Sequence, residues 1–168
     1  AQEKECVAEM SLRGLREYQS QHTGFVAAMA QFEFLPTRTG SLHAARDLVF
    51  TTDPQLNELL SEIDILPVGK FSEDEFLPQL KTLGLRAEPT KHEVYCVATR
   101  IDALSQSHEE RAAQLGEKLH VYFEQHPANY QQLAEKVAGL RWVPVLRERV
   151  EGYPRSLPWA SGEARGTV

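Results

Sequence analysis

Two capping boxes between residues 90 and 110 constrain the fold of this chain more than any other feature. Thr90-Lys91-His92-Glu93 and Ser107-His108-Glu109-Glu110 place a hydroxyl and a carboxylate three residues apart, a pattern typical of helix starts. Apolar residues follow at helical spacing: Val94, Val97, Ala98, Ile101 and Leu104 after the first box, and Ala112, Leu115, Leu119, Tyr122 and Phe123 after the second. Because few residues connect the two segments, we expect an antiparallel helix pair, with His126-Pro127 ending the second helix.

Further helices are predicted before this pair. Apolar residues between Lys4 and Tyr18 recur every three or four positions, and Thr23 can cap a shorter helix. Asp53 and Pro54 are typical of the cap and first position of another helix, which ends near Ser61. The inward-facing residues are expected to be Val7, Ala8, Met10, Leu12 and Leu15, then Phe25, Ala28 and Met29, then Leu56, Leu59, Leu60 and Ile63.

A third capping-box pattern, Ser72-Glu73-Asp74-Glu75, conflicts with Pro78. Phe71 can contact Phe76 across this helix start, but a proline inside a helix removes a hydrogen bond. Either a one-turn helix precedes a second helix starting at Pro78, or one helix is kinked there. Gly84 predicts the helix end, with Leu85 packing on Leu80.

The stretch from Gln31 to Leu42 predicts the chain's first β-structure. An extended chain would place Phe32, Phe34 and Pro36 on one side and Glu33 and Leu35 on the other, and Thr39-Gly40 can reverse it. We expect a small hairpin of Phe32 to Thr37 against Ser41 to Ala44. The alternative is a loop held by the two phenylalanines.

This stretch recurs near the C-terminus. Leu133, Val137, Leu140, Trp142, Val143 and Pro144 follow Phe25, Met29, Phe32, Phe34, Leu35 and Pro36 at a constant offset of 108 residues. We therefore predict that Leu133 to Pro144 repeats the backbone of Phe25 to Pro36, with Leu133 and Val137 buried. Prolines after Pro144 predict an extended return arm in the second copy.

The expected fold class is mainly α with small β-hairpins: an array of about six to seven helices with two short helix-strand-proline units. The 168 residues suit a single domain or a fragment of a larger repeat over residues 1–160, with sub-units 1–50, 51–106 and 107–160 and a flexible tail at 161–168. The absence of an initiator methionine and the Ser161 to Gly166 tail suggest a segment of a longer protein.

Composition argues against several classes of protein. A net charge of −6, without basic and aromatic clusters, makes nucleic-acid binding a poor fit. No apolar run reaches the roughly 18 residues of a membrane span, and the charged N-terminus does not resemble a signal peptide. Cys6 and Cys96 have no metal or redox spacing, and we expect Cys96 to be a buried, reduced thiol in a cytosolic setting.

Candidate catalytic patterns are weak throughout. Gly69-Lys70 lacks the other residues of a phosphate-binding loop, and the histidines (His22, His43, His92, His108, His120 and His126) lack metal-ligand spacing. Asp74-Glu75 and Glu109-Glu110 are interpreted as first-turn acids favoured by the helix dipole. We therefore predict no catalytic, cofactor-binding or metal residues.

Trp142, Tyr153 and Trp159 form the one group that suggests binding. They gather in a proline-rich stretch, which predicts either a clamp onto the domain's own core or a surface that docks a partner.

The proline-anchored motifs of the chain resemble the linker portion of the large internal repeats of the sacsin family. The resemblance spans roughly residues 25 to 160 and rests on these motifs: Phe34-Leu35-Pro36-Thr37, Gly40-Ser41-Leu42, Asp47-Leu48, Asp53-Pro54-Gln55-Leu56, Leu59-Leu60, Leu83-Gly84-Leu85, Trp142-Val143-Pro144-Val145, Tyr153-Pro154 and Ser156-Leu157-Pro158-Trp159.

The resemblance implies a segment of a very large cytoplasmic co-chaperone linked to Hsp70, protein quality control and intermediate-filament organisation, whose loss causes spastic ataxia. Its partners would be other domains of the same protein, chaperone machinery, unfolded clients or intermediate-filament proteins. Neither an Hsp90-like nucleotide motif nor a His-Pro-Asp triplet of a J domain occurs in the chain. The resemblance thus implies only the scaffold role. The alternatives are a purely structural spacer between modules and a small enzyme.

Overall fold

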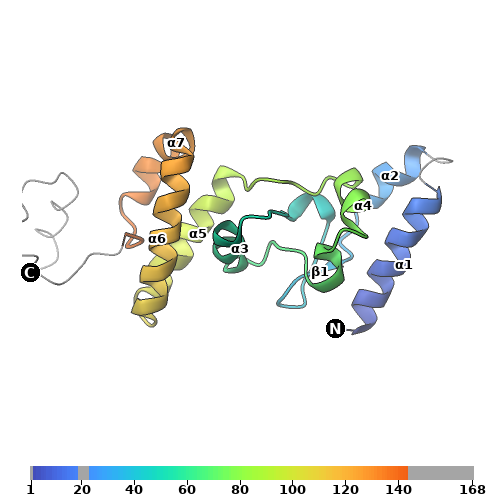
Figure 1. The fold of residues 1–168 in the computed structure, drawn as a ribbon, viewed down its shortest axis with the longest axis horizontal. Helices are drawn as coiled ribbons and strands as arrows, with labels where there is room; N and C mark the ends of the chain where they lie inside the picture. The colour runs from blue at the N-terminus through green and yellow to red at the C-terminus, as the bar shows by residue number, and fades with distance from the viewer. Residues whose placement is uncertain (1, 19–22, 144–168) are drawn as a thin grey trace, which may run out of the picture.

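The computed structural model describes residues 2–18 and 23–143. The elements are α1 (Gln2–Tyr18), α2 (Thr23–Met29), β1 (Leu35–Pro36), β2 (Leu42–His43), the 3-10 helix η1 (Ala45–Asp47), α3 (Pro54–Ser61), the 3-10 helix η2 (Gly69–Ser72), α4 (Leu77–Thr82), α5 (Lys91–Leu104), α6 (Glu109–Gln125) and α7 (Pro127–Val137). The fold is mainly α with a small hairpin, as predicted. Figure 1 shows an elongated molecule, with α1, α2 and α4 at one end, α3 in the middle and α5, α6 and α7 at the other end.

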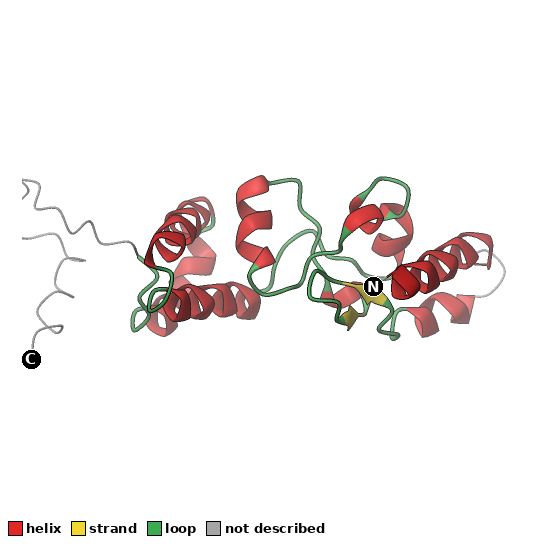
Figure 2. Ribbon diagram, turned by 90° about the horizontal axis from the view of Figure 1, so that it is seen from below, coloured by secondary structure: helices red, strands yellow, loops and turns green. Residues whose placement is uncertain are grey.

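The elongated shape contains two separate hydrophobic cores. The N-terminal core consists of Ala8, Leu12, Leu15, Phe34, Leu35, Ala45, Leu48, Phe71, Phe76, Leu77, Leu80, Leu83 and Leu85. The C-terminal core consists of Val49, Leu59, Leu60, Val94, Val97, Ala98, Ile101, Ala112, Leu115, Leu119, Tyr122, Phe123, Leu133, Val137 and Trp142. The expected sub-units do not coincide with these cores, since residues 51–106 contribute to both. Figure 2 shows loops that run between the helices at the two ends of the molecule.

The chain passes between the cores three times, and these passages are hydrogen-bonded to one another. The Val49 N–H donates to the carbonyl of Ile65 at 2.9 Å, and the Phe50 N–H donates to that of Arg86 at 2.9 Å. Val49 and Arg86 form a parallel β-bridge, completed by a 3.2 Å bond from the Arg86 N–H to the carbonyl of Leu48. This narrow ladder, which we call the junction, connects the two cores.

The Arg86 side chain reinforces the junction. Its guanidinium donates to both carboxylate oxygens of Glu93, at 2.7 and 2.6 Å, and to the carbonyls of Arg46 at 2.8 Å and Asp47 at 3.2 Å. Burial opposes ionisation of Glu93, but hydrogen bonds from Arg86 and Thr90 outweigh it and lower the pKa of Glu93. Arg86 therefore ties the end of η1 to the start of α5.

Of the predicted helix starts, those at Asp53 and Thr90 are confirmed. The Gln55 N–H donates to Asp53 Oδ1 at 2.9 Å, and Pro54 occupies the first helical position. Thr90 and Glu93 form both bonds of a capping box. The box at Ser107 was wrong: α6 begins after His108, which makes no side-chain cap, and Ser107 Oγ instead lies 2.8 Å from His108 Nδ1.

The capping box at Ser72 was also wrong. Ser72 ends η2 and its hydroxyl donates to the carbonyl of Pro67 at 2.7 Å, while α4 begins only at Leu77. Pro78 thus lies in the first turn of α4, where its missing N–H costs nothing. For the same reason Asp74-Glu75 precedes the helix and is not part of its first turn.

Two further predictions about α4 are confirmed. The rings of Phe71 and Phe76 are in contact, with centroids 5.8 Å apart. Gly84 has a φ of 99°, and the Leu85 N–H donates to the Leu80 carbonyl at 2.9 Å, which is the helix end that the sequence predicted.

The predicted hairpin is present but shorter, with Leu35 paired to His43 and Pro36 to Leu42. Gly40 provides the reversal with a φ of 83°. The predicted alternation of faces was wrong: Phe32 is 61% exposed, and the four residues 34–37 are all buried. The reason is that Phe32 still belongs to the turn that ends α2, where its N–H donates to Met29.

The inward faces of the first two helices also differ from the prediction. On α1, Ala8, Leu12 and Leu15 are fully buried, but Val7 and Met10 are exposed. On α2, Val26 replaces the exposed Ala28 beside the half-buried Phe25 and Met29. The remaining predicted stripes, on α3, α5 and α6, do face the C-terminal core.

The internal repeat is visible in the helix ends, but the predicted second strand does not appear within residues 2–18 and 23–143: Val143, the counterpart of the fully buried Leu35, lies in a bend and is 46% exposed. Helices α2 and α7 end at Met29 and Val137, and the turns that follow share bonds from Phe32 to Met29 (3.1 Å) and from Leu140 to Val137 (3.0 Å). Leu133 and Val137 are buried, as predicted. The preceding helices, α1 and α6, are both 17 residues long. Pro144 and the predicted return arm lie outside the described residues.

Candidate interaction surface

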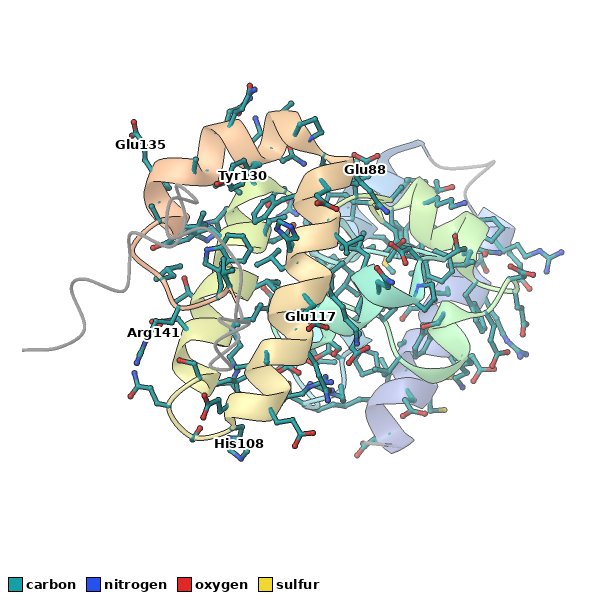
Figure 3. All side chains as sticks on the ribbon, turned by 60° about the vertical axis from the view of Figure 1, so that its left-hand side comes forward. Glu88, His108, Glu117, Tyr130, Glu135 and Arg141 are labelled. Atoms are coloured by element: carbon teal, nitrogen blue, oxygen red, sulfur yellow. The ribbon has the colours of Figure 1, made fainter. Side chains whose placement is uncertain are left out.

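An apolar groove runs between α6 and α7 at the C-terminal end of the molecule. It has a volume of about 740 Å³ and is lined by Glu117, His120, Val121, Phe123, Glu124, Pro127, Tyr130, Trp142 and Val143. Tyr130 and Val143 are large apolar side chains that remain exposed, at 43% and 46%. Figure 3 shows Glu117 on α6 and Tyr130 on α7.

Aromatic contacts form the floor of this groove, which we call the α6–α7 groove. The ring of Phe123 lies 5.4 Å from that of Trp142 and 5.2 Å from that of Tyr130, measured between centroids. The Trp142 indole N–H donates to the carbonyl of Val137 at 3.1 Å, so its polar atom is satisfied inside the protein. The floor is therefore fixed, while its apolar edges remain open to solvent.

A second apolar groove, the α1–α2 groove, lies at the opposite end. It has a volume of about 520 Å³ and is lined by Met10, Ser11, Gly14, Tyr18, Phe25 and Met29. Met10 is 61% exposed, and the rings of Tyr18 and Phe25 meet edge to face at 6.4 Å. Both grooves thus lie between a 17-residue helix and the shorter helix that follows it.

Polar clusters elsewhere hold elements together. Asp64, which has a φ of 57°, accepts hydrogen bonds from the hydroxyls of Thr37 and Thr39 and from the Thr39 N–H at 3.2 Å. Burial raises the pKa of Asp64, but these bonds outweigh it and the net shift is downward. Asp64 therefore fixes the tip of the β1–β2 hairpin to the turn that follows α3.

A network of ion pairs similarly attaches α3 to α6. Glu58 accepts from Lys118 and Arg111, and Glu62 lies 3.1 Å from Arg111. Hydrogen bonds from Lys118 and Arg111 lower the pKa of Glu58. A carboxylate held ionised by two cations is a poor general acid or base, and we assign this network a structural role.

The weak catalytic patterns gain no support from their surroundings. Lys70, in η2, is paired with Glu9 of α1. Within residues 2–18 and 23–143, no group of three or more His, Cys, Asp or Glu side chains is arranged to hold a metal ion. Cys6 is exposed and Cys96 is only partly buried, so the expectation of a buried Cys96 was wrong; both thiols are free.

The three predicted docking residues divide into two groups. Trp142 belongs to the C-terminal core and also lines the α6–α7 groove. Tyr153 and Trp159 lie outside the described residues, so their role stays a prediction. None of the described helices is both long enough and apolar enough to cross a membrane.

The grooves themselves were not predicted from the sequence. Met10 was assigned to a core face because its spacing from Val7 fits a helical stripe, and Tyr130 was not singled out. The available signal was an excess of apolar residues on α1, more than one buried stripe can accommodate.

Comparison of this chain with protein-family models, with curated proteins and with solved structures found no match.

Proposed function

We propose that this chain is a non-enzymatic scaffold that binds protein segments, its own or those of partners, through the apolar grooves at its two ends. The observation that carries the proposal is the pair of grooves of about 740 and 520 Å³, each between a 17-residue helix and the shorter helix that follows it. Exposed apolar surface of this kind, edged by polar side chains, is typical of protein-binding sites.

The arrangement of charges also favours binding over catalysis. Five of the described carboxylates have lowered pKa values. Glu9 is paired with Lys70, and the other four, at Glu58, Asp64, Glu93 and Asp102, are likewise engaged by cations or hydroxyls that connect secondary-structure elements, Asp102 by Arg141. None of these five lines either end groove. The grooves therefore offer mainly apolar contact area, with Glu117, His120 and Glu124 as the charged or titratable residues of the α6–α7 groove.

The proposed setting follows the resemblance to the sacsin family. In this view the chain is a cytoplasmic segment of a large chaperone-like protein, and its partners are neighbouring modules, unfolded clients or filament proteins. The second candidate is a structural spacer, which the elongated shape with its two connected cores favours. The two candidates differ in whether the grooves bind anything.

A binding assay with a matched pair of variants separates them. Binding of a fluorescent, permanently unfolded protein such as reduced, carboxymethylated lactalbumin is measured by anisotropy for the full chain and for Met10→Asp. We expect Met10→Asp to weaken binding at least tenfold, because the carboxylate must be desolvated in the interface.

Val7→Asp provides the control. Val7 lies on the same helix and is 49% exposed, but it does not line the α1–α2 groove. We expect this variant to bind within about twofold of the unmodified chain. Absence of binding by the unmodified chain would favour the spacer, and equal losses in both variants would show that the groove is not the binding site.

A further inference from the structure

We infer that the α6–α7 groove is the docking site of the chain's own segment Tyr153–Trp159. The inference rests on the proposed function, because it treats this groove as a protein-binding surface, and it names the occupant. Val143, the last described residue, itself lines the groove, so the chain continues directly from its edge.

The chain beyond Val143 is long enough to return. Residues 144–152 can span up to roughly 30 Å when extended. The α6 wall between Glu117 and Glu124 is only about 10 Å long at the helical rise per residue. The segment can therefore reverse direction and lie along the groove.

The segment has the side-chain pattern that this groove requires. In an extended chain, Tyr153, Arg155, Leu157 and Trp159 share one side, while Pro154, Ser156 and Pro158 share the other. The first side supplies two aromatic residues and a leucine for the apolar lining formed by Val121, Phe123, Tyr130 and Val143.

Charge complements the apolar match. Two carboxylates, from Glu117 and Glu124, stand among the groove-lining residues, and Arg155 is the only charged residue of the segment. A guanidinium on the apolar side can lay its methylene stem on the groove and place its charge beside the acidic residues.

The prolines reduce the cost of docking. The residues before a proline, Tyr153 and Leu157, are restricted to extended backbone, so the segment loses less conformational freedom when it binds. The first copy of the repeat also supports a returning arm, because the residues after Pro36 reverse direction and pair with β1 as β2. A returning arm after Pro144 is the counterpart of that step.

The test uses the full chain labelled with 5-fluorotryptophan and observed by fluorine NMR. The chain has two tryptophans, and Trp159→Phe assigns their resonances. Replacing H₂O with D₂O changes the fluorine chemical shift of a solvent-exposed fluorotryptophan. If the segment is docked, this change at Trp159 should be less than half of the change measured for the chain unfolded in urea. Val121→Glu should restore the full shift, whereas Gln114→Glu, an exposed position on α6 outside the groove, should not.

Several results would overturn the inference. One is a full solvent shift at Trp159 in the unmodified chain, and another is no response to Val121→Glu while the Trp142 resonance stays in place. Protection that disappears on dilution would assign the groove to a second copy. Should Val121→Glu unfold the chain, Leu157→Asp must release Trp159 instead. Loss of client binding in Met10→Asp tests the proposed function separately, because that residue lies in the α1–α2 groove.

Discussion

Replacing Arg86 with alanine tests how much the Arg86 side chain stabilises the junction between the two cores. The substitution removes the paired bonds to Glu93 and the bonds to the carbonyls of Arg46 and Asp47. The backbone ladder at Val49 and Phe50 remains, so the variant isolates the side-chain contribution.

The expected loss follows from partial burial. The side chains of Arg86 and Glu93 are 26% and 16% exposed, which places the pair between surface ion pairs, worth about 0–1 kcal/mol, and buried ones, whose disruption costs about 3–5 kcal/mol. Glu93 keeps its bonds to Thr90, which limits the cost of the carboxylate left behind. We therefore expect a loss of roughly 2–3 kcal/mol, or a fall in Tm of roughly 5–10 °C.

Urea and thermal unfolding followed by circular dichroism measure this loss, with Arg13→Ala as the matched control. Arg13 pairs with Glu9 on the surface of α1 and is 62% exposed, so its removal should cost at most about 0.5 kcal/mol. Arg86→Lys should fall between the two, because lysine keeps the charge but not the fork of donors. A loss below about 0.5 kcal/mol in Arg86→Ala would refute the reasoning.

The pH dependence gives a second check on the same pair. The pKa of Glu93 lies below its ordinary value of 4.5 in the folded state, so the pair stabilises the protein above that pH. As the pH falls through the folded-state pKa, Glu93 becomes protonated and the contribution is lost. The difference in stability between the unmodified chain and Arg86→Ala should therefore be constant near neutral pH and shrink below about pH 4.5. A difference that grew on acidification would contradict the assignment.

Two further predictions concern the tip of the β1–β2 hairpin and the backbone conformation at glycines. Asp64→Asn should lower the free energy of unfolding in urea by about 1 kcal/mol, since it removes the charged acceptor of the hairpin tip. The pKa of Asp64 lies below its ordinary value of 3.8, so this difference should disappear as the pH falls through the folded-state pKa. A difference that persisted in acid would show that the charge is not its cause. Gly84→Ala should cost about 1–2 kcal/mol, because the residue has a φ of 99° and its added Cβ would lie 3.2 Å from Arg46 Cβ. Gly14→Ala, with no atom within 4 Å of the added Cβ and a helical backbone, should instead stabilise by about 0.5–1 kcal/mol, and similar effects at both positions would contradict this account.

The sequence predicted helices best where local chemistry and the apolar pattern agreed. At Thr90 and Asp53, the capping residue, the spacing and the following stripe all indicated one start, and the structure has it. At Ser72 and Ser107 the same motif was present, but each hydroxyl has another local partner: Ser72 donates to the carbonyl of Pro67, and Ser107 lies beside His108. A capping box is a local signal that a competing partner can override.

The two cores and the junction could not be predicted from the chain in order. Arg86 and Glu93 are close in sequence, but the carbonyls of Arg46 and Asp47 lie about 40 residues away, and no periodicity connects them. The grooves were hidden for a related reason. An apolar residue at helical spacing, such as Met10, is identical in sequence whether a core or solvent covers it. The matching helix ends at Met29 and Val137, in contrast, were readable because their spacing is a property of the sequence itself.

The three passages through the junction have a consequence for how the molecule can be divided. Domains joined by one linker separate when that linker is cut, and each half can be produced alone. Here the chain enters the C-terminal core at residues 51–66 and then goes back to the N-terminal core at residues 69–85. No single cleavage therefore yields two intact halves. A nick at any one passage leaves two covalent connections in place. The same connections would share a load applied at the two ends, so mechanical tension could not part the cores without unfolding one of them.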